Sequence, residues 1–417
     1  MSPRYEKRRN GGGGAILLLI AAAALVVAVL AIFTDVFNGK KAPDTTPDDP
    51  AIAQPDDDAA AKNDADSNEN KPDNNQNTPD SNENDPQGGQ TGTEGGEKTD
   101  KTTVTTTKPA SSNVITAGGT PYQSGGVYIV GDTGFEMYNY VGSLAERYQS
   151  VVNGVADSLS GVSNVYAMAI PLSSGITLPD SLYSDIPGSD QAQAEKDILA
   201  GMGQNVKTVP LHDAMMAHRT EYIYFRTDHH WTALGAYYAY VQFCGIKGIT
   251  PHALSDYEVS QYSGFLGSFY NDGGKPDAMS DNPDVVNAYH PVSATASMKY
   301  GSSESSLTGG KVIFDESTAA ASLKYGTFIM GDNPFTVIEN PEVSNGQSCI
   351  VVKESFGNAF VPFLVDHYQT VYVVDYRYYS GSVTQLAKDK GVTDVLFVNN
   401  LSAIRGSYQM GKLNGVK

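Results

Sequence analysis

The sequence predicts an α/β fold, in which a parallel β-sheet is flanked by helices and preceded by a transmembrane helix and a disordered linker. Short continuous apolar runs alternate with segments of helical periodicity between residues 114 and 417. Such runs are typical of parallel strands that are buried on both faces. Before them, residues 15–33 are apolar throughout and residues 34–113 are almost entirely polar.

The N-terminal segment predicts a membrane anchor. Residues 1–14 form a basic tail, and the apolar run at residues 15–33 would span roughly 28 Å as a helix, close to a bilayer core of about 30 Å. A cleaved signal peptide is the alternative, but the run exceeds a usual signal core and lacks a small-residue cleavage site. The basic flank orients the N-terminus toward the cytoplasm. We therefore expect a single-pass cell-membrane protein with an extracellular C-terminal domain.

Residues 34–113 are rich in Asp, Asn, Pro, Thr and Gly. A segment with so few apolar side chains cannot offset the backbone entropy of folding, so we expect a disordered acidic linker. It serves either as a spacer or as a connection whose composition matters little. The net charge of −19 argues against nucleic acid as a partner.

Residues 114–417 are expected to form one domain. Its first part alternates strands with helices, whereas the Gly-, Ser- and Asn-rich stretch at about 255–345 predicts an irregular insertion with β-hairpins. Regular alternation then resumes. The expected strands are 127–132, 165–171, 206–211, 349–353, 370–375 and 394–400, and the expected helices are 140–159, 191–203, 212–218, 232–243, 359–367 and 382–390.

A cluster of polar residues lies in the middle of the domain. Asp228, His229, His230 and Trp231 follow an aromatic extended segment and precede the helix that Thr232 is suited to cap. Side chains at such a corner often face a ligand. Asp228 and His230 are therefore candidates for an orienting carboxylate and a general base, while His229 and Trp231 are expected to support them.

Two further candidates follow predicted strands. Ser355 follows the strand 349–353, and Asn400 ends the strand 394–400, with Asn399 beside it as the alternative donor. Because ligands bind at the carboxyl ends of parallel strands, these residues are expected near one another. Ser355 is the candidate nucleophile, with the Phe356 N–H and Asn400 as oxyanion donors. The alternative for Ser355 is an ordinary helix N-cap.

Metal binding by Asp228, His229 and His230 is the alternative to a catalytic role for this cluster. Consecutive histidines point in different directions in extended chain, so we expect no metal and no cofactor. The two cysteines, Cys244 and Cys349, both lie in apolar contexts. They predict either a disulfide on an oxidising surface or two buried thiols.

Several motifs carry a resemblance to a known family. Residues 226–232 (RTDHHWT), 353–362 (KESFGNAFVP), 331–332 (GD) and 371–379 (VYVVDYRYY) resemble the DHHW protein family of bacteria. That family is similar to the alginate O-acetyltransferases, which have a circularly permuted SGNH-hydrolase-like fold and carry Gly-Asp before the serine. This chain has Lys353 and Glu354 there.

The resemblance implies an extracytoplasmic O-acyl (acetyl) transferase or esterase that acts on a cell-surface polysaccharide. Ser355 would be the nucleophile, His230 the base and Asp228 the orienting carboxylate. It also implies a partner, a polytopic membrane acyltransferase that supplies acyl groups. Arg377 is a candidate for binding an anionic substrate. Because the residues before Ser355 depart from the relatives, the alternative is a non-catalytic glycan-binding or assembly module in the cell envelope.

Overall fold

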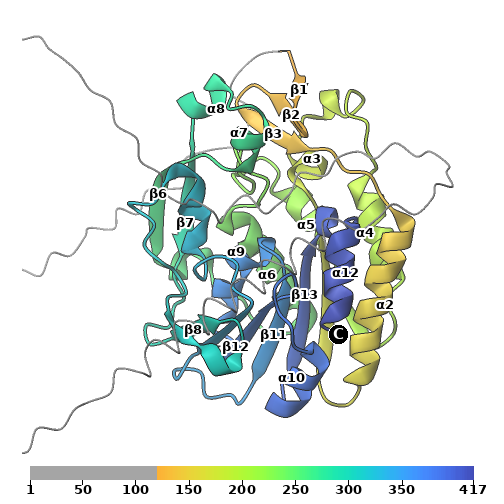
Figure 1. Cartoon of the computed structure of the whole chain (residues 1–417), viewed down its shortest axis with the longest axis vertical. Coiled ribbons are helices and arrows are strands. Elements are labelled where there is room, and N and C mark those ends of the chain that lie inside the picture. The colour runs from red at the N-terminus through yellow and green to blue at the C-terminus, as the bar shows by residue number, and fades with distance from the viewer. Residues whose placement is uncertain (1–119) are drawn as a thin grey trace, which may run out of the picture. The chain divides into compact units, whose positions relative to one another are not determined.

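The apolar runs assemble into an eight-stranded mixed sheet with the order β5-β4-β13-β11-β12-β10-β8-β9. The computed structural model describes residues 120–417 (Figure 1). Neighbouring strands from β5 to β12 run parallel, as predicted, and the last three join by antiparallel pairing. The strands in this order are Val206–Val209, Asn164–Ile170, Asp394–Asn400, Ser348–Lys353, Thr370–Asp375, Phe335–Glu339, Ser297–Gly301 and Thr308–Gly310.

The strands at the centre of the sheet are buried almost throughout. Strand β13 lies between β4 and β11, and its Leu396 pairs with Tyr166 on one side and Val351 on the other. All three side chains are buried. Their strands read as continuous apolar runs because helices cover both faces of the sheet.

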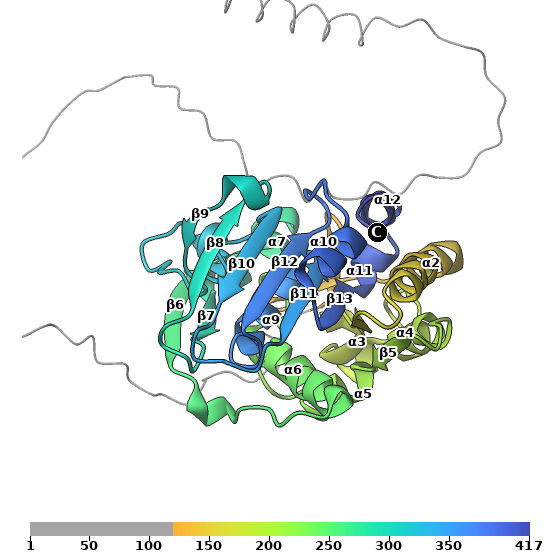
Figure 2. The same ribbon diagram turned by 90° about the horizontal axis from the view of Figure 1, so that it is seen from below.

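The helices form a layer on each face (Figure 2). On one face, α2 (Gly142–Ser158) packs beside α12 (Ser407–Gly415) and α10 (Val383–Lys390). On the other, α6 (Ala233–Lys247) packs against α9 (Phe356–Leu364). Four more helices lie near β4 and β5, namely α3 (Ser173–Ile176), α4 (Gln191–Ala200), α5 (His212–Ala217) and α11 (Leu401–Ile404).

The first predicted strand forms, but it does not join the large sheet. It is β2 (Val127–Val130), the middle strand of a separate antiparallel sheet with β1 (Tyr122–Ser124) and β3 (Thr133–Glu136). The apolar pattern of β2 predicts burial without identifying the pairing partner. Here β2 buries its side chains against the helix α7 (Ser268–Asp272) and the segment around Leu178.

The stretch expected to be irregular contains more regular structure than predicted. It provides the three antiparallel strands of the large sheet and a two-stranded sheet of β6 (Val259–Phe265) and β7 (Asp284–Tyr289). Short helices complete it, namely α7, α8 (Asp277–Asp281), η2 (Leu254–Asp256), η3 (Glu304–Ser306) and η4 (Ala321–Thr327). A further short helix, η1 (Asp180–Leu182), lies between α3 and α4.

The predicted location is wrong for the chain as the structure describes it. We expected a single-pass cell-membrane protein with a cytoplasmic N-terminus, but none of the helices in residues 120–417 combines the length and the apolar character needed to cross a bilayer. The basic tail, the expected span at residues 15–33 and the linker at 34–113 all lie outside the described residues.

Of the two alternatives for the cysteines, the structure has the buried thiols. Cys244 and Cys349 are both free, and burial is the main factor that raises the pKa of the Cys349 thiol.

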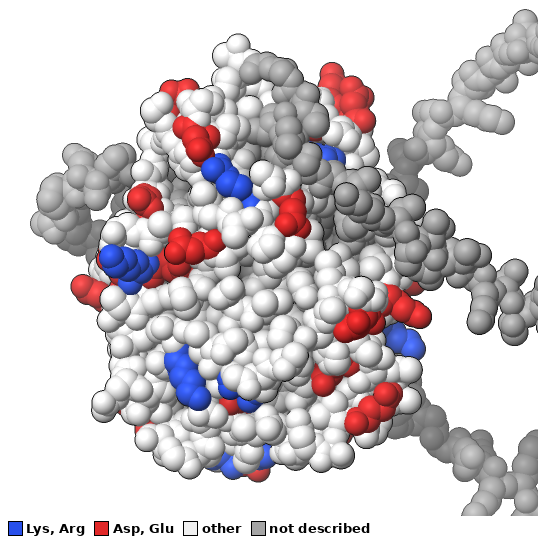
Figure 3. All heavy atoms as spheres, turned by 180° about the vertical axis from the view of Figure 1, so that it is seen from behind, with Lys and Arg blue, Asp and Glu red and all other residues white. Residues whose placement is uncertain are grey.

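On the surface, one face shows acidic and basic side chains interspersed among largely uncharged residues (Figure 3).

Candidate active site

The Asp-His-His-Trp segment forms a loop that closes on itself. An isolated β-bridge joins Tyr224 to Trp231, and the Phe225 N–H donates to the His230 carbonyl oxygen at 3.2 Å. Asp228 and His229 therefore lie at the tip of the loop. Helix α6 starts just after it, and its N-cap Thr232 accepts a hydrogen bond from the Gly235 N–H at 3.3 Å, as predicted.

A buried carboxylate from the insertion holds the base of this loop. Asp284, at the start of β7, is fully buried. It accepts hydrogen bonds from the Thr227 N–H and hydroxyl, both at 2.7 Å, and from the Arg226 N–H at 3.1 Å. The Tyr222 hydroxyl donates to it as well. The insertion thus fixes the position of the loop, because a buried carboxylate needs all of these donors.

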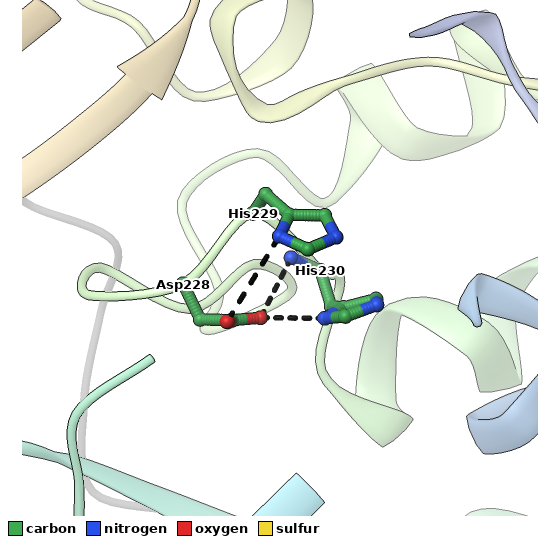
Figure 4. Close-up of side chains that lie close together, drawn as sticks. All are labelled: Asp228, His229 and His230. Atoms are coloured by element: carbon green, nitrogen blue, oxygen red, sulfur yellow. Dashed lines mark hydrogen bonds and ion pairs between the residues drawn. The ribbon is translucent and has the colours of Figure 1, made fainter. Parts of the chain in front are cut away.

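Asp228, His230 and Ser355 lie in line at the carboxyl end of the parallel strands. His230 Nδ1 is 2.6 Å from Asp228 Oδ1, and His230 Nε2 is 2.7 Å from Ser355 Oγ. The Asp228 carboxylate also accepts from the His230 backbone N–H at 3.0 Å (Figure 4). The Asp228 carboxylate can only accept, so its hydrogen bond with His230 places the proton of the neutral imidazole on Nδ1. In this tautomer Nε2 is free to accept the serine proton.

The second oxygen of Asp228 is held from the insertion. Asp228 Oδ2 accepts from the Ser268 N–H at 2.9 Å. The preceding residue, Gly267, passes so close that a Cβ there would lie 2.1 Å from Oδ2. His229 also contacts this segment, with its Nδ1 2.6 Å from Ser268 Oγ. The backbone at Gly267 therefore fixes the rotamer of Asp228.

The charges in this arrangement favour a carboxylate next to a neutral imidazole. Burial raises the pKa of Asp228, but the imidazoles of His230 and His229 and the Ser268 N–H outweigh it and hold that pKa well below its usual range. Burial is also the largest influence on the pKa of His230. Together with the nearby His229, burial lowers this pKa despite the opposing effect of Asp228. His230 is thus neutral near pH 7, as a general base must be.

Aromatic side chains enclose the imidazole and the serine. The ring of Tyr325 stacks on His230, with centroids 4.1 Å apart, and its hydroxyl donates to the Ser355 carbonyl oxygen at 3.1 Å. Trp231 is fully buried, and its Nε1 donates to the Phe356 carbonyl oxygen at 2.9 Å. The loop and the start of α9 are therefore tied together beside Ser355.

Ser355 occupies the N-cap position of α9 without capping it. Its side chain makes no cap hydrogen bond to the helix, and its Oγ is directed to His230 instead. The residue is half-buried, whereas its neighbours Glu354 and Phe356 are buried. Ser355 therefore combines access from outside with contact to a neutral imidazole.

The predicted oxyanion donors are largely occupied by Glu354. The Phe356 N–H donates to Glu354 Oε2 and the Asn400 N–H to Glu354 Oε1, both at 2.9 Å. Asn400 Oδ1 caps α11 by accepting from the Ala403 N–H at 2.8 Å. Among the donors of Ser355, Phe356 and Asn400, two have no acceptor within residues 120–417, namely the Asn400 side-chain amide and the Ser355 N–H. These two are the groups left for an oxyanion.

Arg377 lies in a buried ion cluster next to these residues. Its guanidinium contacts Asp375 and Asp332, each at 2.7 Å, and Lys353 Nζ contacts the same two carboxylates at 2.7 and 3.2 Å. Arg377 is 6% exposed. The structure therefore pairs this side chain with two carboxylates, Asp375 in the interior and Asp332, whose side chain is 31% exposed. The expected contact of Arg377 with an anionic substrate stays a prediction.

The loop also offers a set of potential metal ligands. Atoms of Asp228, His229 and His230 lie within 4.8 Å of one another. However, Asp228 Oδ1 and His230 Nδ1 are 2.6 Å apart, whereas two ligands of a tetrahedral zinc, each at about 2.1 Å from it, stand roughly 3.4 Å apart. The short separation fits a hydrogen bond better than a shared metal.

These features define an α/β protein with an aligned Ser, His and Asp at the edge of its sheet. A family model described as DHHW protein matches residues 61–374, so the chain belongs to the DHHW family. A DHHW family protein from Eubacterium siraeum has a similar structure, at 29% sequence identity and a TM-score of 0.63. The match covers 72% of this chain and 99% of that one.

PatB1 from Bacillus cereus is a second similar structure, and it was determined with a sulfonyl adduct. It matches at 20% identity and a TM-score of 0.55, covering 72% of this chain and 98% of PatB1. At this identity the likeness concerns the fold. No curated protein is similar enough to this chain to count as a match.

Four residues of the site escaped sequence reasoning. Tyr325, Gly267, Ser268 and Asp284 all come from the stretch that we expected to be irregular. The single available signal was the order of the family motifs, which placed this stretch between the two halves of the site. Their contacts depend on how the insertion folds back over the loop.

Proposed function

We propose that this protein is a serine-dependent O-acyl (acetyl) transferase or esterase of a polysaccharide, with Ser355 as nucleophile, His230 as base and Asp228 as orienting carboxylate. The observation that carries the proposal is the unbroken line from Asp228 Oδ1 through His230 to Ser355 Oγ, with separations of 2.6 and 2.7 Å. The proposal includes a circularly permuted SGNH-hydrolase-like arrangement of the large sheet.

The first half of the reaction forms an acyl-serine. His230 Nε2 takes the proton of Ser355 Oγ as this oxygen attacks the acyl carbonyl carbon, and Asp228 stabilises the resulting imidazolium. The Ser355 N–H and the Asn400 amide donate to the oxyanion. When the tetrahedral intermediate collapses, the bond to the leaving alcohol breaks and that alcohol receives the proton from His230.

In the second half, an acceptor hydroxyl attacks the acyl-serine. His230 removes the proton of this hydroxyl and returns a proton to Ser355 Oγ as the acyl group leaves. A sugar hydroxyl as acceptor makes the protein a transferase, whereas water makes it an esterase. The polysaccharide acceptor and the polytopic membrane acyltransferase as acyl source rest on the resemblance to the alginate O-acetyltransferases.

The test is acylation of the full-length protein by a chromogenic acetyl ester. We expect alcohol release and an acetyl group on Ser355 in the peptide mass spectrum, and loss of both in Ser355→Ala and His230→Ala. Ser305→Ala, at an exposed serine in η3, is the matched control and should behave as wild type. A sulfonyl fluoride should label Ser355, by analogy with the sulfonyl adduct of PatB1.

A non-catalytic glycan-binding module is the second candidate, and one observation favours it. Glu354 occupies the Phe356 N–H, which removes a donor that an oxyanion hole at this corner would use. For such a module, folded wild-type protein would show no ester turnover and no labelling of Ser355, yet it would bind a polysaccharide.

A further inference from the structure

A cavity separate from the serine site opens near the carboxyl ends of β4 and β5. Its volume is about 450 Å³, within the size range of pockets that hold small ligands. It is lined from four directions, by Tyr138 after β3, Ser174 in α3, Tyr183 after η1 and His212 at the start of α5. None of these residues belongs to the Asp228–His230–Ser355 arrangement.

The walls of this cavity combine apolar surface with unused hydrogen-bonding groups. Leu178, Ile186 and Met216 contribute the apolar surface. The Tyr138 hydroxyl has no hydrogen-bond partner among the described residues, although Tyr138 is only 3% exposed. His212 Nε2 likewise has no partner there, and its Nδ1 is 3.7 Å from Asp213. Such walls suit a ligand with both apolar faces and hydroxyl groups.

Charge narrows the class of ligand further. The described residues that line the cavity include one carboxylate, Asp190, and no Lys or Arg. Two arginines contact lining residues from outside, Arg219 at Leu178 and Arg405 at Tyr138, but each is paired with a carboxylate of its own, Asp180 and Glu136 respectively. A carboxylate sugar here would therefore face Asp190 without an unpaired cation, which is unfavourable. The cavity therefore suits an uncharged sugar better than a uronic acid.

The topology of the sheet connects this cavity with Ser355. Strands β5, β4, β13 and β11 are parallel neighbours, so His212, Ser174, Asn400 and Ser355 all follow strand ends at the same edge. Ser174 follows the strand two places from β11. At a strand spacing of about 4.8 Å, this puts it roughly 10 Å from Ser355 along the edge. A short oligosaccharide spans such a distance.

We propose that this cavity is an acceptor subsite that binds an uncharged sugar unit of the polysaccharide whose hydroxyl reacts at Ser355. Tyr183, which is 41% exposed, stacks on the sugar ring, and the Tyr138 hydroxyl and His212 Nε2 bond to its hydroxyl groups. The proposal rests on the proposed acyl transfer for its biological role, but the binding itself can be tested separately.

The test is calorimetric binding of two tetrasaccharides to full-length Ser355→Ala protein, which cannot turn over. The probes are a β-1,4-linked glucose tetramer and a mannuronic acid tetramer. We expect the glucose tetramer to bind at least about tenfold more tightly, and Tyr183→Ala to weaken its binding about tenfold. Ala192→Phe, which fills the cavity from α4, should abolish binding.

Tyr408→Ala is the matched control, because Tyr408 is a more exposed tyrosine, at 62%, on α12. It should bind as the parent does. Equal binding of both tetramers, or binding that Tyr183→Ala and Ala192→Phe leave unchanged, would overturn the subsite. Wild-type protein and Tyr408→Ala should hydrolyse the chromogenic acetyl ester at rates within about twofold of each other. Failure of the subsite is thereby separated from failure of the catalytic proposal, in which wild-type protein would show no hydrolysis.

Discussion

The ring of Tyr325 lies nearly parallel to the imidazole of His230, at 13° and with centroids 4.1 Å apart. The same tyrosine donates its hydroxyl to the carbonyl oxygen of Ser355 at 3.1 Å. One residue of the insertion thus contacts both the candidate base and the candidate nucleophile. It limits rotation of the imidazole, and its burial of the ring contributes to keeping His230 neutral.

Substitution of Tyr325 should separate these two contacts. Tyr325→Phe keeps the stacked ring but loses the hydrogen bond to Ser355, so we expect kcat/KM for the acetyl ester to fall about fivefold, as for a bond of about 1 kcal/mol. Tyr325→Ala also loses the stack and should fall about tenfold further. Equal losses in the two variants would show that the ring contributes nothing.

The pH dependence of acylation should report His230. Its pKa is lowered from the ordinary 6.5, mainly by burial, and only the neutral imidazole accepts the Ser355 proton. The rate of acylation should therefore fall as the pH drops through the lowered pKa, with a midpoint below 6.5, and should be level near pH 7. Stopped-flow measurement of kcat/KM from pH 4 to 8 checks this. A midpoint above 6.5 would contradict the assignment of His230 as a buried base.

Gly267→Ala should displace Asp228 without changing any polar group. The new Cβ would lie 2.1 Å from Asp228 Oδ2, so the carboxylate must move away from His230. A displacement of about 1 Å costs roughly a hundredfold in rate, and we expect that loss in kcat/KM for the acetyl ester. The readout that distinguishes positioning from simple destabilisation is the pH profile, whose midpoint should shift when Asp228 moves from His230.

The control for this variant is Gly154→Ala. Gly154 lies exposed in α2, where an added Cβ would meet nothing within 4 Å, and alanine favours a helix by about 1 kcal/mol. Gly154→Ala should thus retain full activity and equal or higher stability. If Gly267→Ala matched it in activity, the backbone at Gly267 would have no role in orienting Asp228.

Glu354 should make the stability of the protein depend on pH. Burial raises its pKa from 4.5 to about 7, against the opposing effects of the Phe356 and Asn400 N–H groups and of Arg377 and Lys353. The folded state therefore holds a proton between pH 4.5 and 7 that the unfolded state has released. From this group, the free energy of unfolding should fall by about 3 kcal/mol as the pH rises through that window.

Chemical denaturation of Glu354→Gln at pH 5 and pH 8 tests this dependence. Wild type should lose unfolding free energy between pH 5 and pH 8. Because glutamine does not titrate, this loss should be smaller in Glu354→Gln. Glu339→Gln, at an exposed position on β10, is the control and should follow wild type. An unchanged difference in Glu354→Gln would mean that Glu354 is ionised in the folded protein throughout this range.

Much of the site follows from local sequence. The apolar runs identify the strands, and parallel strands bring the residues after them to one edge, which is why Ser355 and Asn400 were expected together. The Asp-His-His-Trp segment supplied a carboxylate and an imidazole with suitable spacing. Local sequence did not place Arg377 in its ion cluster, because its pairing with Asp332 depends on a neighbouring segment.

The sequence by itself determined the alternation of buried strands and helices, the order of the family motifs and the residue types available for acyl transfer. Only the tertiary structure decided that β2 joins a separate sheet, that Glu354 occupies the Phe356 N–H, and that Tyr325 and Gly267 support the loop. The physical reason is the distance along the chain over which each signal acts. Apolar periodicity reports burial within a few residues, whereas these contacts join segments whose approach depends on the packing of the whole domain.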